Sequence, residues 1–299
     1  MKITVPFFIP SPPPMHKIMP MIRCIANGEA QAQHYCSIFP DAKITKTNPV
    51  VTTFEIYGQT LSTLNGGTND NAILNPSISF SLWITDADET KRIRDLLADG
   101  GSVMMPFAAY ERSPAYGRCN DKYGVSRQVM YDNRPERTAN ALVPSLMYTG
   151  ANNGKTQEAM EFYTKLFPAS TIDFTRPYGE NAMGEDPTHL NHAEFKLVHQ
   201  QFIAMDSGMD HKFSFNDGIS LSVSCKDQDE IDTYRNAIIA DGGHEVQCGR
   251  CKDRYGVSRQ IVPVQLWEAL FDADPAKAKY AMDTMMQMKK IVIADLYQK

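Results

Sequence analysis

An internal repeat is the sequence feature that most constrains how this chain can fold. Residues 117–128 return as residues 249–260 with ten of the twelve positions identical. Single hydrophobic cores stop growing at roughly 250–300 residues, so 299 residues in two similar halves predict two domains. Three shorter segments recur in the same order: His34-Tyr35 as Phe162-Tyr163, Phe39-Pro40 as Phe167-Pro168, and Asp99-Gly100-Gly101 as Asp241-Gly242-Gly243.

The residue pattern of each half predicts a strand, a helix and three further strands, and this order occurs twice within each half. An apolar strand comes first, and the amphipathic helix after it ends at the Phe-Pro pair, because proline cannot continue a helix. Alternating stretches on either side of Gly58 and of His199 favour hairpins. The expected first strands are residues 18–24 and 142–148. The second unit of each half should begin with a strand, at residues 78–84 and 219–225, and end with one, at residues 127–131 and 259–263. Between them we expect a helix that is capped by Asp86 or Asp227 and ends at Asp-Gly-Gly.

The two halves differ in their connections and at their ends. The first carries a long connection at residues 104–116 and the second at residues 175–191, and both are candidate lids. Residues 1–14 are interpreted as a flexible leader, because their proline cluster interrupts any signal-peptide core. Residues 265–299 follow the second half only and predict a helical tail, whose methionines at helical spacing favour packing over a ligand surface.

Composition narrows the classes of function. A net charge of -5 gives no general attraction to phosphate backbones, so no nucleic-acid partner is expected. No apolar run reaches the roughly 20 residues of a membrane span, so no membrane partner is expected either. Six scattered cysteines favour free thiols and a cytoplasmic location, and the Cys248-Gly-Arg-Cys251 spacing is interpreted as two strand thiols because no second pair lies near it.

The motifs resemble a known family. In order, the chain has the Phe-Pro helix ends, Asn65-Gly66-Gly67, an Ile-Ser-Phe strand from Ile78, Asp-Gly-Gly, the segment 252–263 and a Lys-Ile-Val-Ile-Ala tail. This order resembles PhnB-like proteins of the glyoxalase/vicinal oxygen chelate superfamily, often labelled 3-demethylubiquinone-9 3-methyltransferase-like. The resemblance covers residues 15–299 and includes the repeat.

The resemblance implies an α+β protein with the glyoxalase/bleomycin-resistance-like fold. Paired βαβββ modules would form each of two tandem domains, at residues 15–135 and 140–264, and each pair would curl a sheet around a cavity. Family members commonly pair as homodimers. A fused duplication would supply an intramolecular pseudo-dimer of the two halves, and further homo-oligomers stay open.

Metal-dependent relatives hold a divalent ion with imidazole and carboxylate groups on the first and last strands of their modules. The resemblance places Pro20, Ser79 and Gln128 at those positions in the first half, and Pro144, Ser220 and Gln260 in the second. Proline offers no donor atom, and neutral hydroxyl and amide groups do not offset the dehydration of a divalent cation. We therefore expect no metal and no cofactor, and interpret His189 and His192 as loop histidines without a partner cluster.

Other catalytic signatures are missing from the sequence. No GxGxG turn suits S-adenosylmethionine, and the βαβββ order is not that of a doubly wound methyltransferase, so methyl transfer rests on the family label alone. No GxSxG nucleophile elbow occurs. Asp121 and Asp253 precede a Tyr-Gly turn, which favours hydrogen bonds to the turn backbone, with general acid or base work as the alternative.

Arginine stands where PhnB-like sequences usually carry tryptophan. Arg127 and Arg259 occupy such positions in the last strand of each half. If their side chains faced the cavity, they would form a cationic fork for phosphate or carboxylate. Gln128 and Gln260 alternate to the opposite face, so an inward glutamine implies that the arginine beside it points away.

The leading hypothesis is a metal-free protein that binds an unidentified small molecule. Neutral hydrogen bonds would orient the ligand in an apolar pocket. The alternatives are a metal-independent enzyme acting on an oxygenated small molecule or antibiotic, the methyltransferase of the family label, and an interaction scaffold. The candidate ligand-binding residues are Ser79, Tyr123, Gln128, Ser220, Tyr255 and Gln260, with Arg127 and Arg259 added if they face the cavity.

Overall fold

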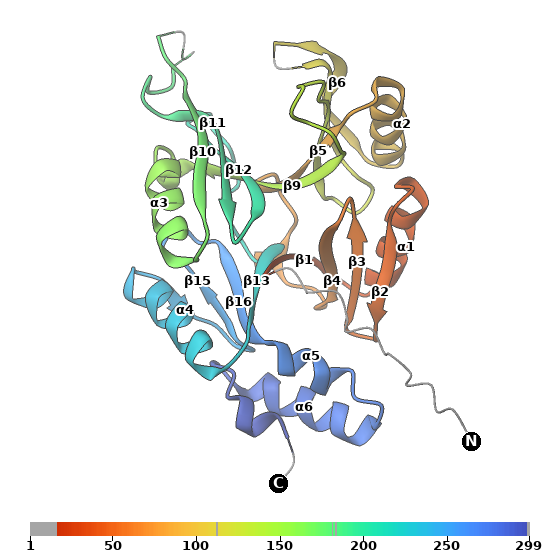
Figure 1. Ribbon diagram of the computed structural model, residues 1–299, viewed down its shortest axis with the longest axis vertical. Helices are drawn as coiled ribbons and strands as arrows, with labels where there is room; N and C mark the ends of the chain where they lie inside the picture. The colour runs from red at the N-terminus through yellow and green to blue at the C-terminus, as the bar shows by residue number, and fades with distance from the viewer. Residues whose placement is uncertain (1–16, 112, 181, 183, 298–299) are drawn as a thin grey trace, which may run out of the picture.

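The computed structural model describes residues 17–297 except 112, 181 and 183; the expected leader lies outside these residues. Two eight-stranded sheets form the body of the protein, and the helices α1 to α4 lie on their outer sides (Figure 1). No helix among the described residues is long and apolar enough to cross a membrane. The mixed α+β class expected from the sequence is confirmed.

The predicted βαβββ order is confirmed in all four modules, although the strand called β14 has only two residues. Asp86 accepts the backbone N–H of Glu89 at 2.7 Å and Asp227 accepts that of Glu230 at 2.9 Å, so both caps form as predicted. In the first half the elements are β1 (Ile18–Cys24), α1 (Gly28–Ile38), β2 (Lys43–Thr47), β3 (Val51–Ile56), β4 (Gln59–Asn65), β5 (Ile78–Ile84), α2 (Ala87–Ala98), β6 (Ser102–Tyr110), β7 (Ser113–Asn120) and β8 (Ser126–Tyr131).

The second half repeats this order and adds the helical tail. A hairpin turn through Val198 and His199, both at positive φ, matches the turn through Tyr57 and Gly58 in the first half. The elements are β9 (Ala141–Thr149), α3 (Thr156–Leu166), β10 (Thr171–Pro177), β11 (Leu190–Leu197), β12 (Gln200–Ser207), β13 (Ile219–Cys225), α4 (Gln228–Ala240), β14 (His244–Glu245), β15 (Arg250–Lys252), β16 (Ser258–Pro263), α5 (Val264–Leu270) and α6 (Pro275–Gln287).

Each sheet combines one module from each half, which differs from the expected pairing of modules within a half. Strand β1 pairs antiparallel with β13, and β5 pairs antiparallel with β9. The order of the first sheet is β14-β15-β16-β13-β1-β4-β3-β2, and that of the second is β10-β11-β12-β9-β5-β8-β7-β6. The first strand of every module offers an equivalent free edge, so the repeat itself does not dictate which modules join.

The connection at residues 104–116 is mostly strand, contrary to the expectation of a long loop. Strands β6 and β7 form an irregular hairpin with three register shifts, which bends it away from a flat sheet. In the first sheet the counterpart of β6 is the two-residue β14. The hairpin therefore gives the second sheet a wall that the first sheet lacks.

The tail closes the first sheet. Trp267 of α5 packs against Met19, Met21 and Val51 on the face of this sheet opposite its helices. Leu266 packs with Val262, Ile291 and Leu296 at the end of β16. Figure 1 shows α5 and α6 (blue) at the end of the molecule where β16 ends. No helix within the described residues occupies the equivalent face of the second sheet.

Candidate functional site

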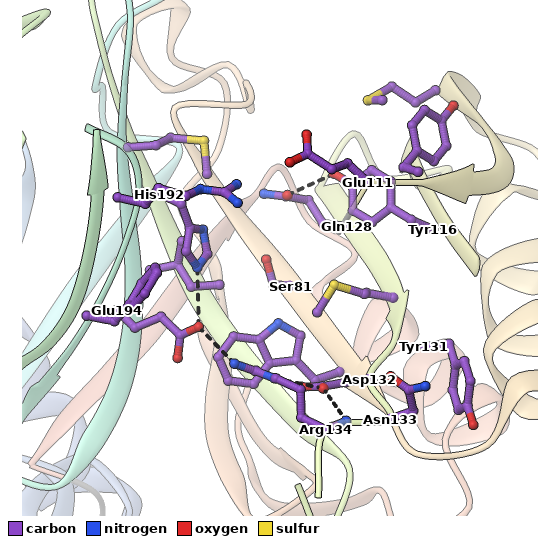
Figure 2. A pocket seen from close by; sticks show the side chains of 18 residues that line it. Ser81, Glu111, Tyr116, Gln128, Tyr131, Asp132, Asn133, Arg134, His192 and Glu194 are labelled. Carbon is purple, nitrogen blue, oxygen red and sulfur yellow. Dashed lines mark hydrogen bonds and ion pairs between the residues drawn. The ribbon is translucent and has the colours of Figure 1, made fainter. Parts of the chain in front are cut away.

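The inner face of the second sheet carries a cavity of about 460 Å³. Apolar side chains from both halves line it, including Trp83 and Met130 from the first and Ile203 and Met205 from the second. Figure 2 shows polar groups on opposite walls, with His192 and Glu194 facing Gln128 and Tyr116 across the space. Because β5 and β9 meet in its centre, the cavity exists only when both halves fold together.

Gln128 is held at one wall by two hydrogen bonds. Its Nε2 donates to Ser79 Oγ at 3.0 Å, and its Oε1 accepts from the Tyr116 hydroxyl at 3.0 Å. Ser81 and Ser145 share a hydrogen bond of 2.8 Å where β5 meets β9. The structure thus brings together the predicted residues Ser79 and Gln128 and fixes the amide orientation with a tyrosine that the sequence did not indicate.

His192 lies in strand β11, not in a loop as the sequence suggested, and it has a partner. Its Nε2 is 3.2 Å from Glu194 Oε1, two residues along the same strand face. Burial by itself raises the pKa of Glu194, but the hydrogen bond with His192 and the charge of Arg134 outweigh it and lower that pKa. An ionised carboxylate only accepts, so Nε2 donates to Glu194, and in the neutral imidazole Nδ1, which is buried without a described partner, is the acceptor.

An ionic network closes the end of the cavity next to Trp83. Arg134 binds Asp132 with two hydrogen bonds, of 2.9 and 2.8 Å, and its Nη1 lies 3.4 Å from Glu194. Burial raises the pKa of Asp132, but the hydrogen bonds from Arg134 more than reverse this and lower it. The guanidinium carbons of Arg134 and Arg137 lie 5.3 and 4.1 Å from the centre of the Trp83 ring, which fixes the indole against the cavity.

Arg127 and Arg259 do not face the cavity. Both are fully buried on the helix side of their sheets, where Arg127 Nε lies 3.1 Å from Asp121 and Arg259 Nε 3.3 Å from Asp253. The Arg127 guanidinium also lies over the Tyr35 ring at 4.5 Å. The alternation argued from the sequence therefore holds for the first half, since Gln128 lines the cavity and Arg127 points away.

The two candidate tyrosines lie apart from Gln128. Tyr123 lines a separate opening of about 500 Å³ with Arg23 and Lys122. Tyr255 is buried, and its hydroxyl donates to Glu158 at 2.9 Å. Their aspartate neighbours form the predicted turn contacts, since Asp121 Oδ1 accepts the backbone N–H groups of Tyr123 and Val125, both at 3.0 Å.

In the first sheet the equivalent residues lie beneath the tail. Gln260 Nε2 is 3.0 Å from Ser220 Oγ, which repeats the Gln128–Ser79 contact, and it also lies 2.9 Å from Met21 Sδ. Trp267 packs on the same methionine. The two predicted sites thus have the same amide–serine contact, but a cavity lies above it in the second sheet, whereas Trp267 packs beside it in the first.

The residues of the second sheet do not fit the divalent metal site of the metal-dependent superfamily members. Ser79 and Gln128 bond to each other. Pro144 is paired with Phe80 on the helix side of the sheet, and the inward residue opposite Ser79 is Ser145, a neutral hydroxyl that bonds Ser81. The neighbouring inward residue of β12 is Ile203, whose side chain cannot coordinate a cation. No group of three His, Cys, Asp or Glu side chains suited to a metal ion occurs within residues 17–297, leaving aside the three undescribed positions.

Comparisons with known proteins agree with the fold and motifs. Among solved structures, a PhnB protein from Bacillus cereus is 35% identical over 40% of this chain and 96% of its own, with a TM-score of 0.37. Glyoxalase I from Zea mays has a TM-score of 0.54 at 11% identity, over 81% of this chain and 89% of its own, and shows the fold alone.

No curated protein matches the chain. The family described as 3-demethylubiquinone-9 3-methyltransferase matches it twice, at residues 16–130 and 140–262. These two matches span most of the sequence and coincide with the two halves of the repeat. The chain therefore belongs to this PhnB-like family.

Proposed function

We propose that the chain binds a small, largely apolar molecule in the cavity of the second sheet, without a metal ion. The observation that carries the proposal is the difference between the two inner faces. Trp267 fills the first, whereas the second keeps a cavity of about 460 Å³. That volume lies within the roughly 300–1,000 Å³ of small-molecule sites, which are mostly apolar with a few placed polar groups.

Side-chain chemistry supports the metal-free part of the proposal. Gln128 and Ser79 would orient the ligand by neutral hydrogen bonds, and Trp83 and the methionines would contact its apolar part. All six cysteines are free, which suits a reducing compartment, so we propose the cytoplasm as the location. Methyl transfer is not part of the proposal, because neither the sequence nor the two βαβββ sheets offer a Gly-rich cofactor turn.

The test combines native mass spectrometry with thermal shifts. The purified chain is incubated with metabolite fractions, and with Mn, Ni, Zn and Fe salts. We expect one ligand per chain, a raised melting temperature, and no shift with the metals. Met130→Trp, which fills the cavity, should abolish the ligand shift, whereas Met286→Trp on the exposed face of α6 should retain it. Equal shifts in both variants, or stoichiometric metal, would overturn the proposal.

A second candidate function is metal-independent proton transfer. The pair formed by His192 and Glu194 favours it, because a carboxylate that holds one ring nitrogen leaves the other to take a proton from a bound substrate. A turnover screen with oxygenated small molecules tests this. His192→Gln should lower kcat at least about a hundredfold with little change in KM, and a raised KM with an unchanged kcat would mean that His192 only binds.

A further inference from the structure

Arg176 differs from the other arginine that lines the cavity. It lies in β10, directly opposite His192 of β11 in the antiparallel register, so both side chains share the cavity face. Arg134 is neutralised by Asp132 and Glu194. Arg176 has no ion pair or hydrogen bond with any residue that the structure describes, and its Nε atom is buried without a partner.

A buried guanidinium nitrogen without an acceptor is unfavourable, because it has lost water and gained nothing in exchange. Arg127, by contrast, places its Nε on the carboxylate of Asp121, although its two terminal nitrogens also lack described partners. Arg176 lines the cavity, and no residue that the structure describes supplies its guanidinium with an acceptor. An anionic group on a ligand would supply it, with the two parallel N–H groups that arginine offers to carboxylate, phosphonate or sulfonate oxygens.

The surroundings define the rest of the ligand. Phe174 lies on the same face of β10, with its ring centre 6.1 Å from that of His192. Trp83 and Met130 line the cavity from the first half. We infer that the cavity takes a small molecule with a planar apolar body and one anionic group, seated on Arg176. This inference rests on the proposed binding function and adds the chemical class of the ligand.

Two dyes with the same ring system test the inference. 8-Anilinonaphthalene-1-sulfonate carries one anionic group, and N-phenyl-1-naphthylamine carries none. Both are titrated by fluorescence into the full chain and into Arg176→Gln, Arg176→Lys and Trp83→Ala. Arg250→Gln is the charge-matched control, because Arg250 is not among the residues that line the cavity and its side chain donates to the backbone carbonyl of Gln247. Far-ultraviolet circular dichroism verifies that each variant is folded.

We expect Arg176→Gln to weaken the sulfonate about tenfold or more and the neutral dye less than about twofold. Arg176→Lys should keep part of the selectivity, the control should keep all of it, and Trp83→Ala should weaken both dyes. If Trp83→Ala weakens both dyes but Arg176→Gln leaves the sulfonate unchanged, the anion site is wrong and the cavity function stands. If neither dye binds, or Trp83→Ala affects neither, the cavity function itself is overturned.

Discussion

The buried Asp121–Arg127 pair predicts a large loss of stability for one isosteric substitution, Asp121→Asn. Asp121 Oδ1 accepts the two turn amides, and an asparagine oxygen can keep both. Asp121 Oδ2 accepts the Tyr35 hydroxyl at 2.7 Å and Arg127 Nε at 3.1 Å. In asparagine that atom becomes an NH2 group, a donor that faces two donors.

The magnitude follows from what is left behind. Arg127 is fully buried, and its two terminal nitrogens have no partner among the residues described, so Asp121 is its only carboxylate there. Removing one member of a buried ion pair costs about 3–5 kcal/mol, because the remaining charge stays in a low dielectric. Asp121→Asn/Arg127→Met removes both charges and should return to within about 2 kcal/mol of the original chain.

Urea unfolding followed by circular dichroism measures these differences. Asp88→Asn, at an exposed carboxylate of α2, is the control and should change the unfolding free energy by less than about 1 kcal/mol. Asp253→Asn should reproduce the loss, because Arg259 is buried and paired in the same way. The reasoning is refuted if Asp121→Asn costs no more than the control, or if the double variant is no more stable than Asp121→Asn alone.

Three further predictions concern other parts of the chain. Trp267→Ala should lower the unfolding free energy by about 3 kcal/mol in the same assay, because it empties the inner face of the first sheet, whereas Tyr297→Ala at an exposed side chain should not. Iodoacetamide at pH 7.5 should modify Cys36 and Cys248 first, because burial raises the pKa of Cys24 to about 12 and Cys251 is fully buried. Peptide mass spectrometry measures the rates, and equal rates at Cys248 and Cys251 would contradict the prediction. The pKa of Glu194 is lowered in the folded state, so this carboxylate stabilises the fold above its unfolded-state pKa of about 4.3, and the stabilisation is lost as the pH falls. Glu194→Gln should therefore lose less stability than the original chain between pH 7 and pH 3. An equal loss in both would exclude a contribution from Glu194.

Local chemistry made most of the elements predictable from the sequence. Strands β1, β5 and β13 coincide with the expected ranges because their ends are marked by turn residues and helix caps. The alternation of Gln128 and Arg127 predicted which of them would face the cavity, since successive strand residues point to opposite sides. These are inferences from neighbours in the chain, and they needed no knowledge of which strands pair.

The candidate site was less predictable because its walls come from different halves. His192 and Glu194 enter it only because β9 joins β5, and the repeat gives every module the same free edge. The sequence did contain one signal: His192 and Glu194 are two residues apart, so in a strand their side chains lie on the same face. The irregular hairpin of β6 and β7, which the sequence suggested was a loop, then brings Tyr116 to Gln128.

The symmetry of the repeat also concealed the structural difference between the inner faces of the two sheets. Both have a glutamine bonded to a serine on the inner face, so the sequence predicts two equivalent sites. Two features separate them: a long β6–β7 hairpin beside one, whose strand β6 has a counterpart of only two residues in the other half, and a tail that places Trp267 over the other. A duplicated fold can in this way keep one inner face open as a cavity while the other becomes part of the core, and the segments that do not repeat determine which.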